Sequence, residues 1–303
     1  MIVGVHHLGI AVRSFDTAMP FYEASAGLSM VSPQSGEQDD IRWLAGPNTY
    51  VALHRSTTTG ASTGQGTALN EPGIRHFCAQ NHDGVLLETA VNTSGGRLIA
   101  PLLDLGTGNQ YAYTRDPEAN IMEIEGLPYA PVMQQTWIGH IAIVTEDMDA
   151  SLGVFSALLG KEPQGRRNIG PTPQIDRMGG LNGALLEGAW LPAHNLLLEF
   201  WRFRAPKFEG VVERKDPHET GYSHLAFETD DLAGDTARLV SLGGDLIENI
   251  LDVPSLDAVT VRTVGGVIIK LVQPTNAAFS LSSLPDLGIC ARTEAGKANP
   301  VVA

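Results

Sequence analysis

The sequence predicts an α+β fold in which one strand-and-helix unit occurs four times. Two observations support this prediction. Four histidines each open a short stretch of alternating apolar residues, and each is followed twenty residues later by a glycine. Because glycine accounts for only 33 of 303 residues, four such coincidences indicate an internal repeat. The pairs are His7 with Gly27, His76 with Gly96, His140 with Gly160, and His224 with Gly244.

Each repeat begins with a stretch of β-strand character. Apolar residues such as Leu8 and Ile10 alternate after the histidine, which is the period of a strand that packs one face into a core. The other face, which carries the histidine, has small neighbours such as Gly9 and Ala11. Such a face leaves room for a ligand or a metal.

A helix is expected after each of these strands. The shared glycine suits the position just beyond a helix C-terminus, where the backbone commonly turns left-handed. A residue that can cap a helix N-terminus also follows each strand. These candidate caps are Ser14 or Asp16, Asp83, Thr145, and Asp230 or Asp231.

The repeats divide the chain into four modules. Consecutive modules are expected to pair, which gives an N-terminal domain over residues 1–131 and a C-terminal domain over residues 136–275, with a tail over 276–303. Pairing of module two with module three is the alternative. The modules lie at about residues 4–56, 73–128, 137–205 and 222–274.

Three connecting segments have a composition of their own. Residues 56–66 are rich in Ser, Thr and Gly and predict a loop. Residues 116–120, Asp-Pro-Glu-Ala-Asn, predict a turn between two strands. Module three carries a long insertion over residues 163–194, whose prolines and glycines predict irregular structure.

The composition excludes several classes of partner. Twenty basic and 34 acidic residues give a formal net charge of −14, which argues against a nucleic-acid surface and against anionic membranes. Cys78 and Cys290 are too few for a disulfide framework or a thiolate metal site. No signal-peptide pattern and no apolar run of about eighteen residues is present. We therefore expect a cytoplasmic protein with a small-molecule substrate, as a monomer or a homo-oligomer.

These features together resemble the vicinal oxygen chelate superfamily. That group includes glyoxalase I, extradiol ring-cleaving dioxygenases, methylmalonyl-CoA epimerase and bleomycin-resistance proteins. The resemblance rests on the first-strand histidines, on Phe-Tyr or Val-Phe in the expected helices, and on the pattern Asp-Pro-x-x-Asn-x-x-Glu that ends at Glu123. It covers nearly the whole chain. It implies βαβββ modules that pair into two cupped mixed β-sheet domains with flanking helices.

The resemblance also implies a divalent metal, held by first-strand histidines and last-strand glutamates. In the N-terminal pair this gives His7, His76 and Glu123. The second candidate set is His140, Glu199 and His224. Pairing of modules two and three would instead gather His76, Glu123, His140 and Glu199.

The last strands of the other modules are less favourable for a metal. Module one has Ala52 at the glutamate position, with His54 as a reserve ligand. Module four has Lys270, which would repel a cation. Two imidazoles and one carboxylate are the donor set of non-haem Fe(II) oxygenases. Fe(II) is therefore the expected metal, with Mn, Zn and Ni as alternatives.

The function implied by the resemblance is that of an extradiol-type dioxygenase acting on a catecholic molecule in aromatic compound catabolism. Tyr113 lies ten residues before Glu123, where those enzymes have a tyrosine that hydrogen-bonds the substrate, although Ala119 replaces their usual glycine. Their acid–base histidine has no counterpart in residues 56–66. His54 or His82 is expected to supply it.

Two alternatives belong to other functional classes. A glyoxalase-like isomerase, epimerase or lyase would use the metal as a Lewis acid for an enediolate, with Glu123 or Glu199 as proton shuttle. A metal-free protein of the bleomycin-resistance type would only sequester a flat ligand. The repeated histidines disfavour the second alternative. Cys78 is expected to be a small filler.

Overall fold

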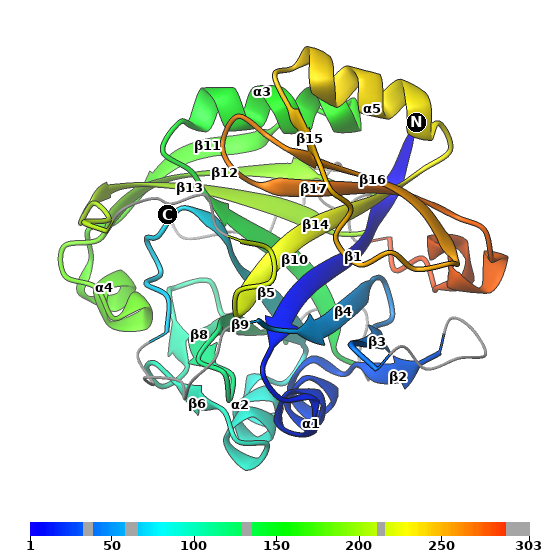
Figure 1. Ribbon diagram of the computed structural model, residues 1–303. Coiled ribbons are helices and arrows are strands. Elements are labelled where there is room, and N and C mark those ends of the chain that lie inside the picture. Colours follow the sequence, from blue (N-terminus) through cyan, green and yellow to red (C-terminus); the bar gives the residue numbers. More distant parts are fainter. Residues whose placement is uncertain (33–38, 58–65, 129–134, 211–215, 289–303) are drawn as a thin grey trace.

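The computed structural model describes residues 1–32, 39–57, 66–128, 135–210 and 216–288. Two mixed β-sheets fill the centre of the molecule, and helices cover opposite ends (Figure 1). At one end α1 (Phe15–Ala26) packs beside α2 (Gly84–Thr93). At the other end α3 (Met148–Leu159) packs beside α5 (Leu232–Ser241). The α+β class predicted from the sequence is confirmed.

All four predicted modules contain strands around one main helix. The first has strands β1 (Ile2–Val12), β2 (Ser29–Val31), β3 (Ile41–Ala45) and β4 (Tyr50–Arg55). The second has β5 (Gly73–Asn81), β6 (Arg97–Leu98), β7 (Leu103–Asp104), β8 (Gln110–Arg115) and β9 (Ile121–Gly126). The third has β10 (Trp137–Val144), β11 (Gln164–Ile169), β12 (Leu185–Pro192) and β13 (Leu197–Ala205). The fourth has β14 (Gly221–Thr229), β15 (Asp245–Ile247), β16 (Leu256–Arg262) and β17 (Ile268–Pro274).

The helix ends follow the predicted pattern in part. Gly27 and Gly160 end α1 and α3 in the left-handed conformation, with φ of 64° and 63°. The helices of modules two and four end earlier, so their shared glycines lie beyond the cap. Asp147, rather than Thr145, caps α3 and accepts a hydrogen bond from the backbone of Ala150.

The strand pairing corrects the prediction that consecutive modules pair. The eight-stranded sheet has the order β15-β16-β17-β14-β1-β4-β3-β2 and joins modules four and one. The nine-stranded sheet has the order β11-β12-β13-β10-β5-β9-β8-β6, with β7 as its ninth strand paired to β8 outside this order. It joins modules three and two, which is the alternative pairing. Within its own module, each first strand pairs along one edge only. The other edge can pair with any similar strand. The four first strands resemble one another too closely for their sequences to determine the partner. The domain limits at residues 131 and 136 stay a prediction.

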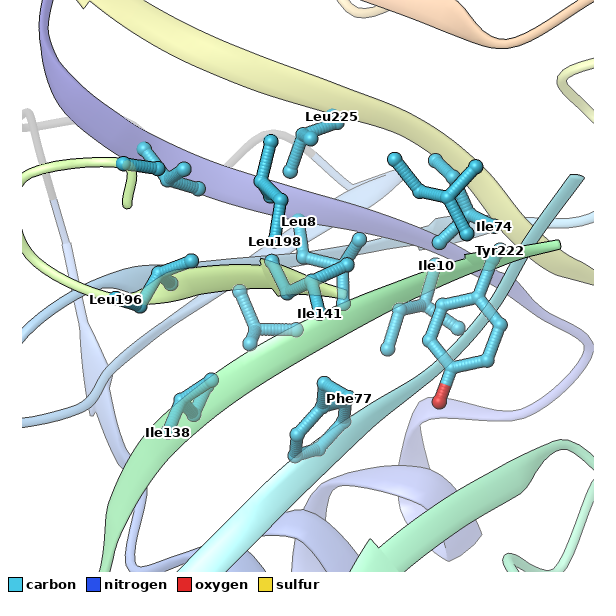
Figure 2. Close-up of a cluster of buried hydrophobic side chains, with 14 of the residues drawn as sticks. Leu8, Ile10, Ile74, Phe77, Ile138, Ile141, Leu196, Leu198, Tyr222 and Leu225 are labelled. Atoms are coloured by element: carbon cyan, nitrogen blue, oxygen red, sulfur yellow. The ribbon is translucent and has the colours of Figure 1, made fainter. Parts of the chain in front are cut away.

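The two sheets share one hydrophobic core. Apolar residues on the faces opposite the histidines pack between the sheets, among them Leu8 and Leu225 from one sheet and Phe77, Ile141 and Leu198 from the other (Figure 2). These five side chains are fully buried. The alternation of apolar and other residues in the sequence therefore reflects two different strand faces. One face packs in the core between the sheets, and the face that carries the histidine points away from this core.

The insertion of module three is ordered, contrary to the prediction of irregular structure. It contains β11, the short helix α4 (Pro173–Gly179) and β12. Thr172 accepts a hydrogen bond from Ile175 at the start of α4, and Gly180 ends the helix with φ of 64°. The prolines and glycines that predicted irregularity are thus the start and stop signals of a helix.

The structure describes some of the shorter connections and part of the tail. Residues 116–120 form the predicted turn between β8 and β9. Most of the predicted loop over 56–66 lies outside the described residues, as does Cys290. The tail continues from β17 into two short 3-10 turns, Ala277–Phe279 and Leu281–Ser283. In the described parts of the chain, no helix has the length and hydrophobicity needed to cross a membrane.

Candidate metal centre

The strand register gives all four modules the same geometry. In each module, the residue two positions after the histidine lies opposite the last-strand position that the sequence analysis assigned. The partners are Gly9 with Ala52, Cys78 with Glu123, Ala142 with Glu199, and Ala226 with Lys270. Ala52, not His54, is therefore the module-one counterpart of the glutamates. Each sheet presents two histidines and two last-strand residues on one face.

Two histidines and two glutamates meet on the nine-stranded sheet. They are His76 on β5, Glu123 on β9, His140 on β10 and Glu199 on β13. One donor atom from each lies within 4.8 Å of the other three, and all four side chains are buried. Glu123 Oε2 is 2.9 Å from His140 Nε2 and 3.1 Å from His76 Nε2. Glu199 Oε2 is 3.4 Å from His140 Nε2 and 3.8 Å from His76 Nε2.

The two glutamates concentrate negative charge at this point. Burial alone would raise the pKa of Glu123, but its hydrogen bond with His140 and its close contact with His76 outweigh burial and lower that pKa to about 2. Burial alone would lower the pKa of His140, but the charges of Glu199 and Glu123 raise it to about 10. Burial, followed by repulsion from Glu123, raises the pKa of Glu199. The cluster therefore favours positive charge at its centre.

Several polar atoms at the cluster have no hydrogen-bond partner among the described residues. They include Nε2 of His76, Oε2 of Glu199 and the hydroxyl of Tyr113, and all three are buried. Orphaned buried groups are rare in proteins and often mark an ion or a water. Imidazole and carboxylate donors suit a divalent cation such as Zn²⁺, Mn²⁺, Fe²⁺ or Ni²⁺. The residues thus fit the divalent metal that the resemblance implied.

A second set of residues surrounds the donors. The indole of Trp190 on β12 donates to Glu199 Oε1 at 2.8 Å. The amide of Gln80 donates to Glu125, whose pKa is raised to about 8 by burial and then by the charge of Glu123. Cys78 is fully buried, and burial raises the pKa of its thiol, which keeps it protonated. Its sulfur lies near Glu123, Glu125 and His140.

Tyr113 lies beside the donors, as the sequence analysis expected. Its ring centroid is 5.1 Å from that of His76, and the side chain is 1% exposed. Burial raises the pKa of its phenol well above the usual value, so the hydroxyl keeps its proton and can donate it in a hydrogen bond. Tyr113, Trp201 and Phe203 line a pocket that opens over Glu123, His140 and Glu199.

The matching face of the eight-stranded sheet has a different chemistry. His7 on β1 and His224 on β14 contact each other, with their Nε2 atoms 3.0 Å apart. Lys270 on β17 is fully buried and donates to the backbone carbonyls of Ile250 and Leu251. Burial lowers the pKa of this lysine to about 8. Trp43 and Phe279 pack together over His6 and His7, with ring centroids 4.7 Å apart.

The histidines of this sheet form a directed hydrogen-bond chain. His6 Nε2 donates to the carbonyl of Phe279 at 2.8 Å, which leaves His6 Nδ1 to accept from His7 Nδ1. By the same rule His7 Nε2 accepts from His224 Nε2, and His224 Nδ1 accepts from Ser223. Burial lowers the pKa of His6 to about 4, and those of His7 and His224 well below their usual values. All three imidazoles are therefore neutral, and each ring nitrogen has a partner in another imidazole, in Phe279 or in Ser223.

Pairing of consecutive modules implied two candidate sets of metal ligands. In the structure, the residues of each set lie in different sheets. His7 lies with His224 and not with His76 and Glu123. The second set is divided in the same way, since His140 and Glu199 lie in the nine-stranded sheet. His54 bonds to Ser223 at 2.9 Å on the eight-stranded sheet, and neither His54 nor His82 lines the pocket. Sequence reasoning missed Trp190, because no local pattern links a tryptophan on β12 to a glutamate on β13.

No protein-family model and no curated protein sequence matches this chain. Solved structures do match. Glyoxalase I from Zea mays superposes with a TM-score of 0.66 at 17% identity, over 92% of this chain and 95% of that chain. A proposed dioxygenase from Bacillus subtilis superposes with a TM-score of 0.57 at 15% identity, over 98% of this chain and 96% of that chain. The chain therefore has the same fold as these two proteins.

At these identities the likeness establishes the fold and leaves the chemistry to the residues themselves. In this chain the cup of the nine-stranded sheet carries four donors of the kind that bind divalent metals. The cup of the eight-stranded sheet carries two histidines, an alanine and a lysine at the same positions.

Proposed function

We propose that the protein is a metal-dependent isomerase or lyase that moves a proton on a carbon next to two neighbouring oxygens of its substrate. The observation that carries this proposal is the four-residue donor set of His76, Glu123, His140 and Glu199. Two imidazoles and two carboxylates would supply four ligands, and a divalent ion that accepts six would then have room for the two oxygens of one substrate. A facial set with a single carboxylate would leave a third position, which oxygen activation uses.

A divalent ion held by these four residues would polarise the two substrate oxygens as a Lewis acid. Glu199 is the residue best placed to carry the proton. Its Oε1 is oriented by the indole of Trp190, while its Oε2 has no hydrogen-bond partner among the described residues. Glu199 would thus act both as a ligand and as the base, through the oxygen that Trp190 leaves free. Glu123, in contrast, is held as an anion by both histidines.

Hydrogen exchange at carbon would test this proposal directly. The protein, purified without chelator, is incubated with 2-hydroxyacetophenone in deuterium oxide, and loss of the methylene signal is followed by proton NMR. We expect catalysed exchange that is abolished by Glu199→Gln and retained by His224→Gln, the matched control in the other sheet. Exchange that is no faster than without protein, or that survives Glu199→Gln, would contradict the assignment.

A ring-cleaving dioxygenase is the second candidate, and Tyr113 is the observation that favours it. A protonated phenol beside His76, without a partner of its own, suits hydrogen bonding to a substrate oxygen that gains charge. Oxygen uptake with catechol measures this activity. If the wild type consumes oxygen, Tyr113→Phe should lower turnover by roughly two to four orders of magnitude at unchanged metal content. Absence of oxygen uptake in the wild type would eliminate this candidate.

A further inference from the structure

The pocket above the four donors is enclosed mainly by apolar side chains. Tyr113, Trp201 and Phe203 form one wall, and Trp190 stands beside Glu199. The cover comes from the insertion of module three. Ile175 and Met178 on α4 line the pocket and are both buried. This insertion therefore does more than connect two strands, because it closes the cup over the donors.

The size of the pocket limits what can fill it. The pocket has a volume of about 150 Å³. A cavity of about this volume, lined by aliphatic and aromatic residues, accommodates one benzene molecule. Three of the four donors, Glu123, His140 and Glu199, also line this space. A ligand that reaches the donors thus has room for about one ring behind its oxygens.

The described lining of the pocket contains one arginine and three glutamates. Among the described residues that line the pocket, Arg167 is the single Lys or Arg. Its guanidinium lies over the ring of Trp190, 5.3 Å from the ring centroid. Three glutamates, Glu123, Glu125 and Glu199, face the same space. Away from the metal donors, the described lining therefore offers a single cationic side chain to a ligand body.

We propose that the substrate is a compact molecule with one apolar ring attached to its pair of neighbouring oxygens, and that the insertion of module three selects for the ring. The position of the oxygens rests on the proposed function. Selection of the ring rests on the volume and the apolar lining alone. Ile175, Met178 and Ala184 of the insertion are specificity-determining residues in this scheme.

A series of hydroxamates tests the selection for a ring. Acetohydroxamate, benzohydroxamate and 2-naphthohydroxamate carry the same two adjacent oxygens and differ only in the apolar body. Calorimetric titration of the metal-loaded protein should show benzohydroxamate binding about 30-fold more tightly than acetohydroxamate, because the ring buries additional apolar area. The naphthyl compound should bind no more tightly than benzohydroxamate. Equal affinities for the acetyl and benzoyl compounds, or binding of neither, would overturn the inference.

Variants of the insertion test whether its side chains are responsible for the selection of the ring. Ala184→Leu fills the pocket and should weaken benzohydroxamate at least about tenfold while leaving acetohydroxamate unchanged. Met178→Ala enlarges it and should let the naphthyl compound bind more tightly than the benzoyl compound. Gln174→Leu changes the exposed side of the same helix and should alter neither affinity. Unchanged selectivity in both pocket variants, with normal thermal unfolding, would also overturn the inference.

Metal analysis of the same samples separates this inference from the proposed function. A protein that holds no metal but still prefers the benzoyl over the acetyl compound would contradict the proposed function and support the pocket assignment. A protein that holds one metal per chain and does not distinguish the two compounds would contradict the pocket assignment alone.

Discussion

The two sheets are built on one plan and differ at two side chains that decide their chemistry. Each presents two first-strand histidines. At the last-strand positions the nine-stranded sheet has Glu123 and Glu199, whereas the eight-stranded sheet has Ala52 and Lys270. Without carboxylates, the histidines of the second sheet hydrogen-bond to each other and remain neutral. A repeated backbone therefore preserves positions, while the side chains determine whether a position binds a cation.

The two sheets also differ in the space above their histidines. Over the four donors, the insertion of module three leaves a pocket. Over His7 and His224, Trp43 and Phe279 pack against the imidazoles, and a cluster of buried apolar residues closes the cup. Ser280, the residue after Phe279, donates a hydrogen bond to Glu228 at 2.6 Å. One cup is thus a candidate site, and the other has become part of the core.

The largest expected difference between the cups concerns metal affinity. Glu123→Ala removes one of four donors and should weaken binding of Mn²⁺ or Zn²⁺ by roughly two to three orders of magnitude. His7→Ala removes a first-strand histidine from the other cup and should leave the metal content unchanged. Competitive titration against a chromogenic chelator measures both. Loss of metal from the His7 variant would show that the eight-stranded sheet holds the site.

In the eight-stranded sheet the cup is filled by core residues. Truncation of one of these side chains should therefore lower the stability of the protein and leave metal binding unchanged. Phe279→Ala removes a ring that is 2% exposed and packs against His6, Trp43 and Tyr50. We expect a loss of about 3 kcal/mol in the free energy of unfolding, measured by denaturant titration, with unchanged metal affinity. A loss below about 1 kcal/mol would mean that the tail is not part of this core.

A smaller effect is expected from the residue that orients Glu199. Trp190→Phe keeps most of the ring and removes the N–H that donates to Glu199 Oε1 at 2.8 Å. Loss of such an orienting hydrogen bond typically weakens a metal site 10- to 100-fold, and the retained aromatic ring favours the lower figure. Chelator competition should therefore show about a tenfold loss. Trp43→Phe in the other cup is the control, and it should not change the metal affinity.

The smallest difference lies in the turns that precede the last strands. Ala119 before β9 and Gly266 before β17 stand at equivalent positions, four residues before Glu123 and Lys270, with φ of 71° and 80°. A left-handed φ strains alanine but not glycine. Ala119→Gly should therefore stabilise the protein by about 0.5 kcal/mol, and Gly266→Ala should destabilise it by about 1 kcal/mol. Thermal unfolding measures both shifts, and equal signs for the two variants would contradict this reasoning.

The sequence alone predicted the features that depend on local periodicity. The four modules, the buried and open faces of each first strand, and the alignment of Ala52, Glu123, Glu199 and Lys270 all follow from spacings within one module. A two-residue strand period and a capped helix are short-range properties, so one copy of the repeat contains the information. Tyr113 was placed beside the candidate donors by the same kind of spacing.

Only the tertiary structure decided which modules meet. Every first strand offers a similar open edge, so β1 could have paired with β5 as readily as with β14 on local grounds alone. The pairing of β5 with β10 brings His76 and Glu123 to His140 and Glu199, and it carries His7 to the opposite sheet. The cover of α4 over the donors has the same origin. Such contacts join residues far apart in the chain, and their choice depends on the packing of the whole core rather than on any local pattern.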